Sequence, residues 1–298
     1  MKLLEEIAVA SSAELETTLA RSRNSPLVLW HLLSLDAPSV AVAWTWFTAR
    51  ITGTALPLAT LVAMGLAVWV LYAADRLLDT RALEPMGDPG EFEARHFFHH
   101  RHRSAFVFGI VSATAGLALL LPRLAPDSIH LYLTEAALMA GYFFLIHATP
   151  LREGRRRIAL PKELMVGPFF AAATFIPTVA RNPGLRLALV PDAVLFAALC
   201  CLNCLFIYAW EHPKPNAHWT TNRAVPRLAL LASLVVAASV ALALAHRSLW
   251  MYPVACGLSG LGLLALDRMR GAFGRPTLRA AADAVLLAPL ALLPLLMR

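Results

Sequence analysis

Repeated apolar runs of about 20 residues limit most strongly what this chain can fold into, because about 20 mostly apolar residues in a helix cross a hydrocarbon layer. Pro or Gly stands at most of the joins between the runs. Nine runs occur, at roughly residues 36–52, 55–74, 104–122, 129–148, 164–180, 189–210, 228–246, 249–266 and 280–297. The sequence therefore predicts an all-α, polytopic membrane protein with nine transmembrane helices.

The composition agrees with a membrane domain and argues against a soluble one. Charged residues make up 15% of the chain, whereas about 25% is usual for a soluble domain. The net charge of +7 comes from bases in short loops, which favours contact with membrane lipids and no nucleic acid. The four cysteines lie inside apolar runs, where we interpret them as packing residues: Cys200, Cys201, Cys204 and Cys256.

The distribution of basic residues predicts the orientation in the membrane. The loops after the second, fourth, sixth and eighth runs contain 17 Lys or Arg, whereas five lie in or beside the other loops. By the positive-inside rule, the even-numbered loops and the N-terminus are cytoplasmic. We therefore expect residues 1–35 to form a cytoplasmic segment with an amphipathic helix, and residues 36–298 to form one multi-pass domain (in the inner membrane, if the source is bacterial). Acidic residues near the start do not fit a cleavable leader: Glu5, Glu6, Glu14 and Glu16.

Two acidic positions end the second run. Asp75 and Asp79 are four apart and share one face of a helix. Such carboxylates repel each other unless a cation lies between them, and Mg²⁺ prefers one or two carboxylates together with substrate phosphates. A metal-bound diphosphate is one interpretation, and a solvated helix end balanced by Arg76 and Arg81 is the other.

The sixth run ends in a similar way, with Glu211 on the same predicted side as Asp75. Asn203 lies eight residues earlier and roughly 12 Å deeper at the rise of a helix. An amide at that depth faces a cavity or makes an interhelical hydrogen bond, and the sequence leaves both interpretations open.

These features resemble the UbiA superfamily of intramembrane prenyltransferases, which have nine transmembrane helices and acidic motifs after helices two and six. In the first motif, Asn-Asp-x-x-Asp-x-x-x-Asp, this chain matches at Asp75 and Asp79, and Arg76 matches the Arg that often follows. Leu71 and Tyr72 replace the leading Asn and Asp.

The second motif matches in part, and a basic loop follows the fourth run as in the family. Asn203 matches and Glu211 stands at the last Asp, whereas Cys204 and Ile207 replace the other two positions. The loop resembles the family's in Thr149-Pro150-Leu151-Arg152, Arg155, Arg156, Arg157, Pro161 and Lys162.

The resemblance implies Mg²⁺-dependent transfer of an isoprenoid chain from a prenyl diphosphate to a small aromatic or lipophilic acceptor within the membrane. Asp75, Asp79 and Glu211 are the implied metal-binding and catalytic residues, and three carboxylates suit one Mg²⁺ better than two. The implied substrate-binding residues are Arg76, Asn203, Tyr208 and Tyr72, with Arg152, Arg155, Arg156 and Lys162 around the departing diphosphate. Aromatic side chains would stabilise the allylic cation or else face lipid: Phe143, Phe144, Tyr208, Trp210, Phe169, Phe170 and Trp69.

Two other functions remain open. His96, His99 and His100 form a His-x-x-His-His sequence like that of membrane di-iron oxidases, but no second box of this kind occurs, and a basic strip at lipid headgroups is the alternative. The degraded motifs also fit a non-catalytic lipid-binding protein or a transporter, with intramembrane polar residues along its path: Glu135, His147 and Asp283.

Overall fold

The computed structural model describes residues 25–83, 98–99, 101–148, 162–212 and 219–296. These residues form helices and turns and contain no strand. The helices are α2 (Pro26–Leu32), α3 (Asp36–Ile51), α4 (Leu58–Leu83), α6 (Arg103–Leu120), α7 (Pro126–Ala148), α8 (Lys162–Arg181), α9 (Val190–Glu211), α10 (Trp219–Ala224), α11 (Leu228–Ala245), α12 (Met251–Arg268), α13 (Arg275–Val285), α14 (Ala288–Ala291) and α15 (Leu293–Leu296). Short 3₁₀ turns occur at Leu121–Arg123, Pro183–Leu185, Val225–Arg227 and Arg270–Ala272.

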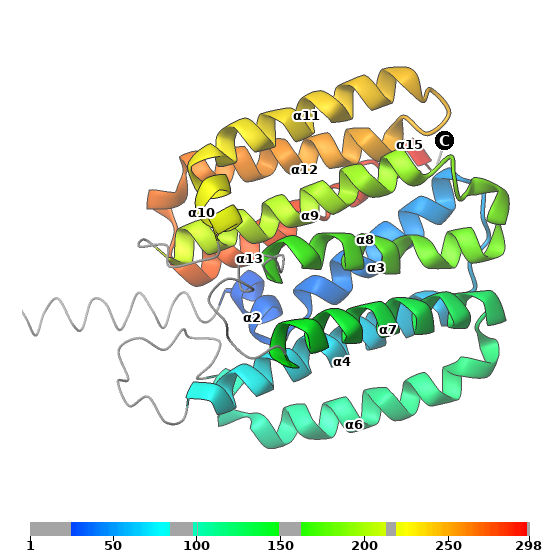
Figure 1. Cartoon of the computed structure of the whole chain (residues 1–298), viewed down its shortest axis with the longest axis vertical. Helices are drawn as coiled ribbons and strands as arrows, with labels where there is room; N and C mark the ends of the chain where they lie inside the picture. The colour runs from blue at the N-terminus through cyan, green and yellow to red at the C-terminus, as the bar shows by residue number, and fades with distance from the viewer. Residues whose placement is uncertain (1–24, 84–97, 100, 149–161, 213–218, 297–298) are drawn as a thin grey trace, which may run out of the picture.

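The long helices lie side by side and alternate in direction (Figure 1). Helix α3 packs against α4 and α8, α9 packs against α8, α11 and α12, and α6 packs against α4. The C-terminal ends of α4, α7, α9 and α12 therefore lie at one end of the bundle. This is the end predicted to carry the basic loops.

Aromatic side chains fill the centre between α3, α9 and α12. The Trp44 ring lies 4.2 Å from that of Phe196 and 4.9 Å from that of Tyr252, measured between centroids. The Trp44 indole N–H donates to the carbonyl oxygen of Leu286 at 2.7 Å, which fixes the end of α13 against α3. Burying each of these rings stabilises the fold where helices distant in sequence meet.

The outer helices expose large apolar side chains instead of burying them. Phe108 and Leu119 of α6 are 74% and 78% exposed, and Leu244 of α11 is 73% exposed. Apolar surface of this extent is unfavourable in water and is normal against lipid. The chain is therefore a membrane protein.

The described residues contain five helices that are long and apolar enough to cross a membrane: Leu58–Leu78, Arg103–Arg123, Leu164–Arg181, Val190–Glu211 and Trp219–Ala245. They correspond to the second, third, fifth, sixth and seventh predicted runs. The first run coincides with α3, which counts as a sixth span if α2, bent by 93° from it, belongs to the same crossing. The fourth and eighth runs form α7 and α12, which are not among these five helices.

The ninth predicted run, 280–297, is not one continuous helix. Helix α13 ends at Val285, and the short helices α14 and α15 follow it. Pro289 and Pro294 lie in this segment, and a proline removes a backbone donor and crowds the preceding turn of a helix. Nine transmembrane helices therefore remain a prediction.

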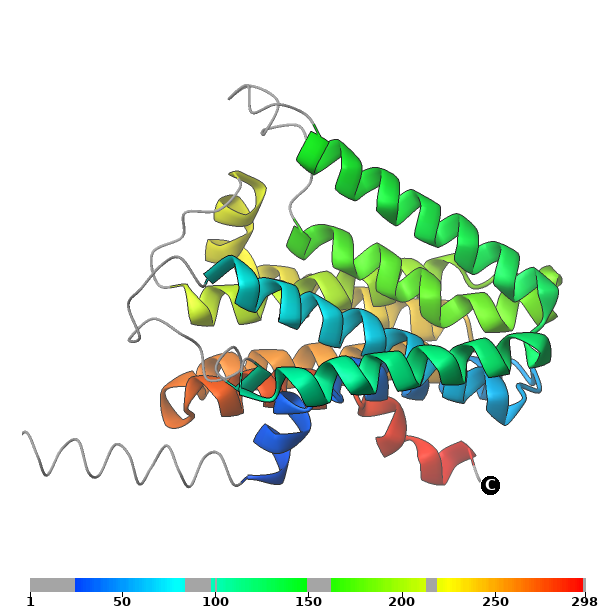
Figure 2. The same cartoon turned by 90° about the horizontal axis from the view of Figure 1, so that it is seen from below.

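Residues 26–35 were predicted as the end of an N-terminal segment, and they pack against the bundle. Val28 and His31 are buried, and α2 contacts α13. Figure 2 shows α2 and the C-terminal segment on the same face of the bundle. Residues 1–24 lie outside the described part, so the expected amphipathic helix stays a prediction.

Candidate functional site

A buried arginine marks the inner face of the end of α4. Arg76 is only 3% exposed, and its guanidinium carbon lies 4.2 Å from the centre of the Tyr72 ring, one turn earlier. A cation over an aromatic face gains a favourable electrostatic interaction. Because a buried guanidinium also needs hydrogen-bond acceptors, the surrounding helices must supply them.

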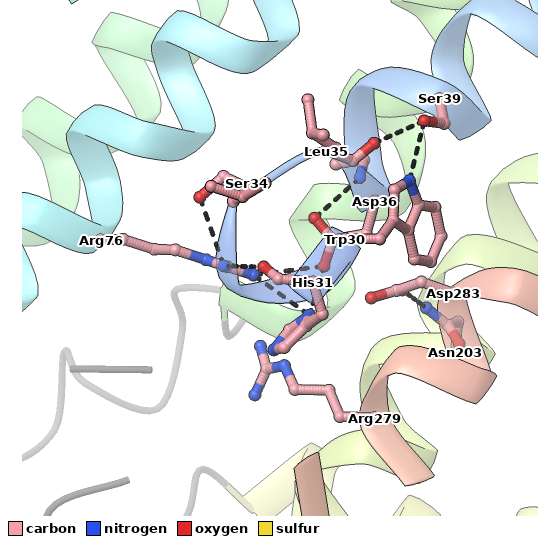
Figure 3. Close-up of polar contacts among 12 residues, drawn as sticks. Trp30, His31, Ser34, Leu35, Asp36, Ser39, Arg76, Asn203, Arg279 and Asp283 are labelled. Carbon is pink, nitrogen blue, oxygen red and sulfur yellow. Dashed lines mark hydrogen bonds and ion pairs between the residues drawn. The ribbon is translucent and has the colours of Figure 1, made fainter. Parts of the chain in front are cut away.

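The corner between α2 and α3 supplies these acceptors (Figure 3). Arg76 Nη1 donates to the carbonyl oxygen of His31 at 2.6 Å and to Ser34 Oγ at 3.3 Å. Arg76 Nη2 lies 3.2 Å from Asp36 Oδ2, and Asp36 is fully buried. The corner therefore combines a buried ion pair with a carbonyl directed at the same guanidinium.

A left-handed residue makes this corner possible. Ser34 has a φ of +59°, which is uncommon outside glycine, and lies in the turn between α2 and α3. Asp36 begins α3, where a negative charge interacts favourably with the helix dipole, and its Oδ1 accepts from the backbone N–H of Ala37 at 3.0 Å. His31 Nδ1 lies 2.5 Å from Asp36 Oδ2. The turn thus brings His31 and Asp36 together, five residues apart.

Helices α9 and α13 contribute two further polar pairs. Asn203 Nδ2 donates to Asp283 Oδ1 at 2.9 Å, and Arg279 Nη1 lies 2.5 Å from Glu211 Oε1. Burial by itself would lower the pKa of Arg279, but Tyr72 and Glu211 favour its charged form and raise the pKa overall. Arg279 is therefore a permanent cation at this end of the bundle.

We call the set His31, Asp36, Arg76, Asn203, Glu211, Arg279 and Asp283 the polar cluster. One potential ligand atom from each of His31, Asp36 and Asp283 lies within 4.8 Å of the others, and this is the metal-ligand group found among the described residues. The Nε atoms of Arg76 and Arg279 are buried without a hydrogen-bond partner in this part of the chain. An unmade bond of a buried donor costs about 1–3 kcal/mol, so an oxygen acceptor is expected there.

The structure places the predicted acidic residues unevenly. Glu211 joins the polar cluster, whereas Asp75 is half-buried at the position before Arg76 and its side chain points elsewhere, because successive helical residues project about 100° apart. Asp79 lies in α4, but its side chain is outside the described residues. No metal-ligand group in the described part contains Asp75 and Glu211 together.

The predicted substrate-binding residues are also only partly described. Arg76 and Asn203 belong to the polar cluster, Tyr72 lies under Arg76, and the Tyr208 ring stacks on His212 with centroids 4.4 Å apart. Lys162 begins α8, but its side chain is outside the described residues, as are Arg152, Arg155 and Arg156.

Two of the aromatic candidates and one of the histidine candidates have hydrogen-bond partners in the bundle. Trp69 Nε1 donates to the Leu33 carbonyl oxygen at 3.1 Å, and Trp210 Nε1 to Asp267 Oδ1 at 2.9 Å. His99 is buried, with Nε2 3.1 Å from Ser34 Oγ, so it packs beside the α2–α3 corner. His96 and His100 lie outside the described residues.

His31, Asp36 and Arg279 belong to none of the motifs that the sequence shows. His31 precedes the first apolar run, so hydropathy gave no reason to place it inside the bundle. Two features of the sequence could have pointed to Asp36 and Arg279. Asp36 is an acid at the start of an apolar run, and Arg279 lies four residues before Asp283 on a helix.

The resemblance to the UbiA superfamily depends on the order of the apolar runs, the basic loops and partial motifs. The structure places Arg76 of α4 and Asn203 and Glu211 of α9 in the polar cluster. Comparison of the chain with protein-family models, with curated proteins and with solved structures found no match.

Proposed function

We propose that this chain is a multi-pass membrane enzyme, with a cytoplasmic N-terminus, that transfers an isoprenoid chain from a prenyl diphosphate to a lipophilic acceptor. One observation carries the proposal: Arg76 of α4 and Asn203 and Glu211 of α9 reach a common buried cluster at one end of the bundle. Two helix ends that are far apart in sequence thus contribute to one site, and this supports the proposal.

Mg²⁺ would be held at the end of α4, next to the polar cluster rather than in it, because the side chain of Asp75 points away from the cluster. The carboxylates of Asp75 and Asp79 have the donor chemistry that Mg²⁺ prefers, together with diphosphate oxygens. Glu211 fits less well, because its Oε1 is already bonded to Arg279. A metal ion held by Asp75 and Asp79 would neutralise charge on the departing diphosphate.

The described residues supply binding and charge rather than covalent chemistry. Arg279 and Arg76 are buried cations with an unused Nε donor each, which suits oxygen atoms of a diphosphate. Tyr72 lies between the apolar part of α4 and Arg76, at the depth where the diphosphate would join its prenyl chain. Such preorganised charge stabilises a leaving group without rearrangement during the reaction.

A second candidate is a lipid-binding or transport protein without catalysis. The observation in its favour is that Asp36 and Glu211 are already paired with Arg76 and Arg279, so fewer carboxylates are available to a metal. On this alternative the polar cluster binds a lipid headgroup or stabilises the packing of the helices.

The test is prenyl transfer by the purified full chain in phospholipid vesicles. We expect Mg²⁺-dependent incorporation of label from radiolabelled prenyl diphosphates into an acceptor from a membrane lipid extract. Asp75→Asn should lower the rate about 100-fold, as the loss of one electrostatic group from an active site commonly does. Asp127→Asn is the matched control, because Asp127 is exposed at the start of α7, at the opposite end of the bundle.

The other outcomes separate the candidates. Saturable binding of prenyl diphosphate without transfer, unchanged by Asp75→Asn, would favour the lipid-binding protein. If the protein neither binds prenyl diphosphate nor transfers the prenyl group, the enzyme proposal is wrong. Tightly bound iron in the purified protein would instead support the histidine alternative.

A further inference from the structure

The charges of the polar cluster do not balance when every group has its ordinary protonation state. Arg76 pairs with Asp36 and Arg279 pairs with Glu211. Asp283 remains, and no Lys or Arg in the described part of the chain lies within ion-pair distance of it. Its Oδ1 accepts one hydrogen bond, from the neutral amide of Asn203. An ionised Asp283 would therefore be a buried charge without an Arg or Lys at ion-pair distance in the described part of the chain.

A second carboxylate lies beside Asp283. A carboxyl oxygen of Asp283 and one of Asp36 are within 4.8 Å of each other, and Figure 3 shows the two side chains projecting into the same space from α13 and α3. Two carboxylates this close and this far from water cannot both ionise unless a cation lies between them. Either a metal ion or a proton must resolve the repulsion.

The geometry argues against the metal ion. His31 Nδ1 and Asp36 Oδ2 are 2.5 Å apart, which is the separation of a hydrogen-bonded pair. Two ligands of one metal, each at about 2.0–2.2 Å, stand roughly 3 Å apart. Arg76 Nη2 also lies 3.2 Å from Asp36 Oδ2 and 3.4 Å from His31 Nδ1, so a cation already occupies this side of both atoms.

We propose that Asp283 binds a proton and shares it with Asp36, which makes the polar cluster a proton-binding site inside the bundle. Arg76 and the backbone N–H of Ala37 favour the ionised form of Asp36, so the proton resides on Asp283. This inference does not depend on prenyl transfer.

Other titratable and charged groups also face Asp283. They are His31 of α2, Asp36 of α3, Tyr72 of α4, Cys200 of α9 and Arg279 of α13. Tyr72 and Cys200 are neutral in this setting, and Arg279 is paired with Glu211. His31 and Arg279 favour the ionised form of Asp283, but burial and the neighbouring Asp36 carboxylate outweigh them.

Infrared spectroscopy of the full chain in lipid vesicles tests the protonation state directly. At pH 5 the wild type should show the C=O stretch of a protonated carboxyl group, shifted in heavy water, that Asp283→Asn lacks. Asp192→Asn is the matched control, because Asp192 is another buried carboxyl of the bundle, near the opposite end of α9. Its substitution should leave the band of Asp283 in place. A wild-type minus Asp283→Asn spectrum without a carboxyl band would overturn the proposal.

The pH dependence of stability gives a second test. The folded chain keeps a proton that the unfolded chain releases above about pH 4, so stability falls as pH rises until Asp283 ionises. Asp283→Asn should remove this part of the slope, and it should fold, since Asn has the shape of the neutral acid. If Asp283→Asn does not fold, the proposal is wrong. The proposal is also wrong if each wild-type chain binds one metal ion that the Asp283→Asn variant does not bind.

Discussion

Arg76 shows how one residue links the acidic end of α4 to the N-terminal corner. Its guanidinium binds the His31 carbonyl, Ser34 and Asp36, which lie 40 or more positions earlier in the chain. Each bond joins α4 to the corner between α2 and α3. The sequence predicted Arg76 as a substrate-binding residue, and that role remains a prediction beside the structural one.

Arg76→Met should destabilise the protein by about 3–5 kcal/mol, because it leaves Asp36 buried without its cation. Reversible unfolding in mixed detergent micelles would measure the change. Arg50→Met is the control, since Arg50 is exposed at the end of α3. Equal stabilities of the two variants would show that the Asp36–Arg76 pair does not hold the corner in place. Asp36→Asn combined with Arg76→Met should cost less than the sum of the single substitutions.

At the scale of helices, hydropathy predicted most of the elements and missed the arrangement of their polar ends. The long runs became helices because each satisfies its own backbone hydrogen bonds whatever its neighbours are. The break after Val285 was not predicted, although Pro289 and Pro294 were visible in the sequence. His31 reaches the bundle through a turn at Ser34, and a pattern of apolar residues carries no information about such a turn.

The candidate site was predictable only where it depended on helix ends. Glu211 and Asn203 were expected near the inner end of α9, and both lie in the polar cluster. Their partners lie in α13, where Asp283 was part of the ninth predicted run and Arg279 was part of the basic loop before it. Pairing between helices is set by packing, which leaves little trace in a single sequence.

Close packing of α8 on α9 gives a prediction at the same scale. A Cβ at Gly167 would overlap the Cys201 sulfur and the Ala197 carbonyl oxygen, and the second of these is backbone. Gly167→Ala should therefore cost about 1–3 kcal/mol of stability, since the two helices must separate. Gly141 of α7 has no neighbour within 4 Å of such a Cβ, so Gly141→Ala should gain about 0.5–1 kcal/mol. Thermal unfolding of both variants in detergent would measure the difference, and equal effects would contradict the packing described for Gly167.

The molecule as a whole has an apolar exterior and a polar interior at one end. Helix α6 buries few of its side chains, whereas α9 buries half of its apolar stretch. A water-soluble bundle would have the opposite arrangement on its outer helices. The exterior of the bundle therefore suits contact with lipid, and the charged groups of the polar cluster lie inside it.

A charge on the outer face distinguishes the two environments. Val111 lies near the middle of α6 and is 63% exposed. In a membrane, Val111→Lys should shift the apparent free energy of inserting this helix by about 2.5–3.5 kcal/mol. Leu187→Lys is the control, because Leu187 is 86% exposed in the turn between α8 and α9, where a lysine reaches the headgroups at little cost. Glycosylation sites placed on either side of α6, in protein translated into microsomes, would report the inserted fraction. If Val111→Lys inserts as well as Leu187→Lys, α6 does not face hydrocarbon, and the membrane arrangement of the outer helices is wrong.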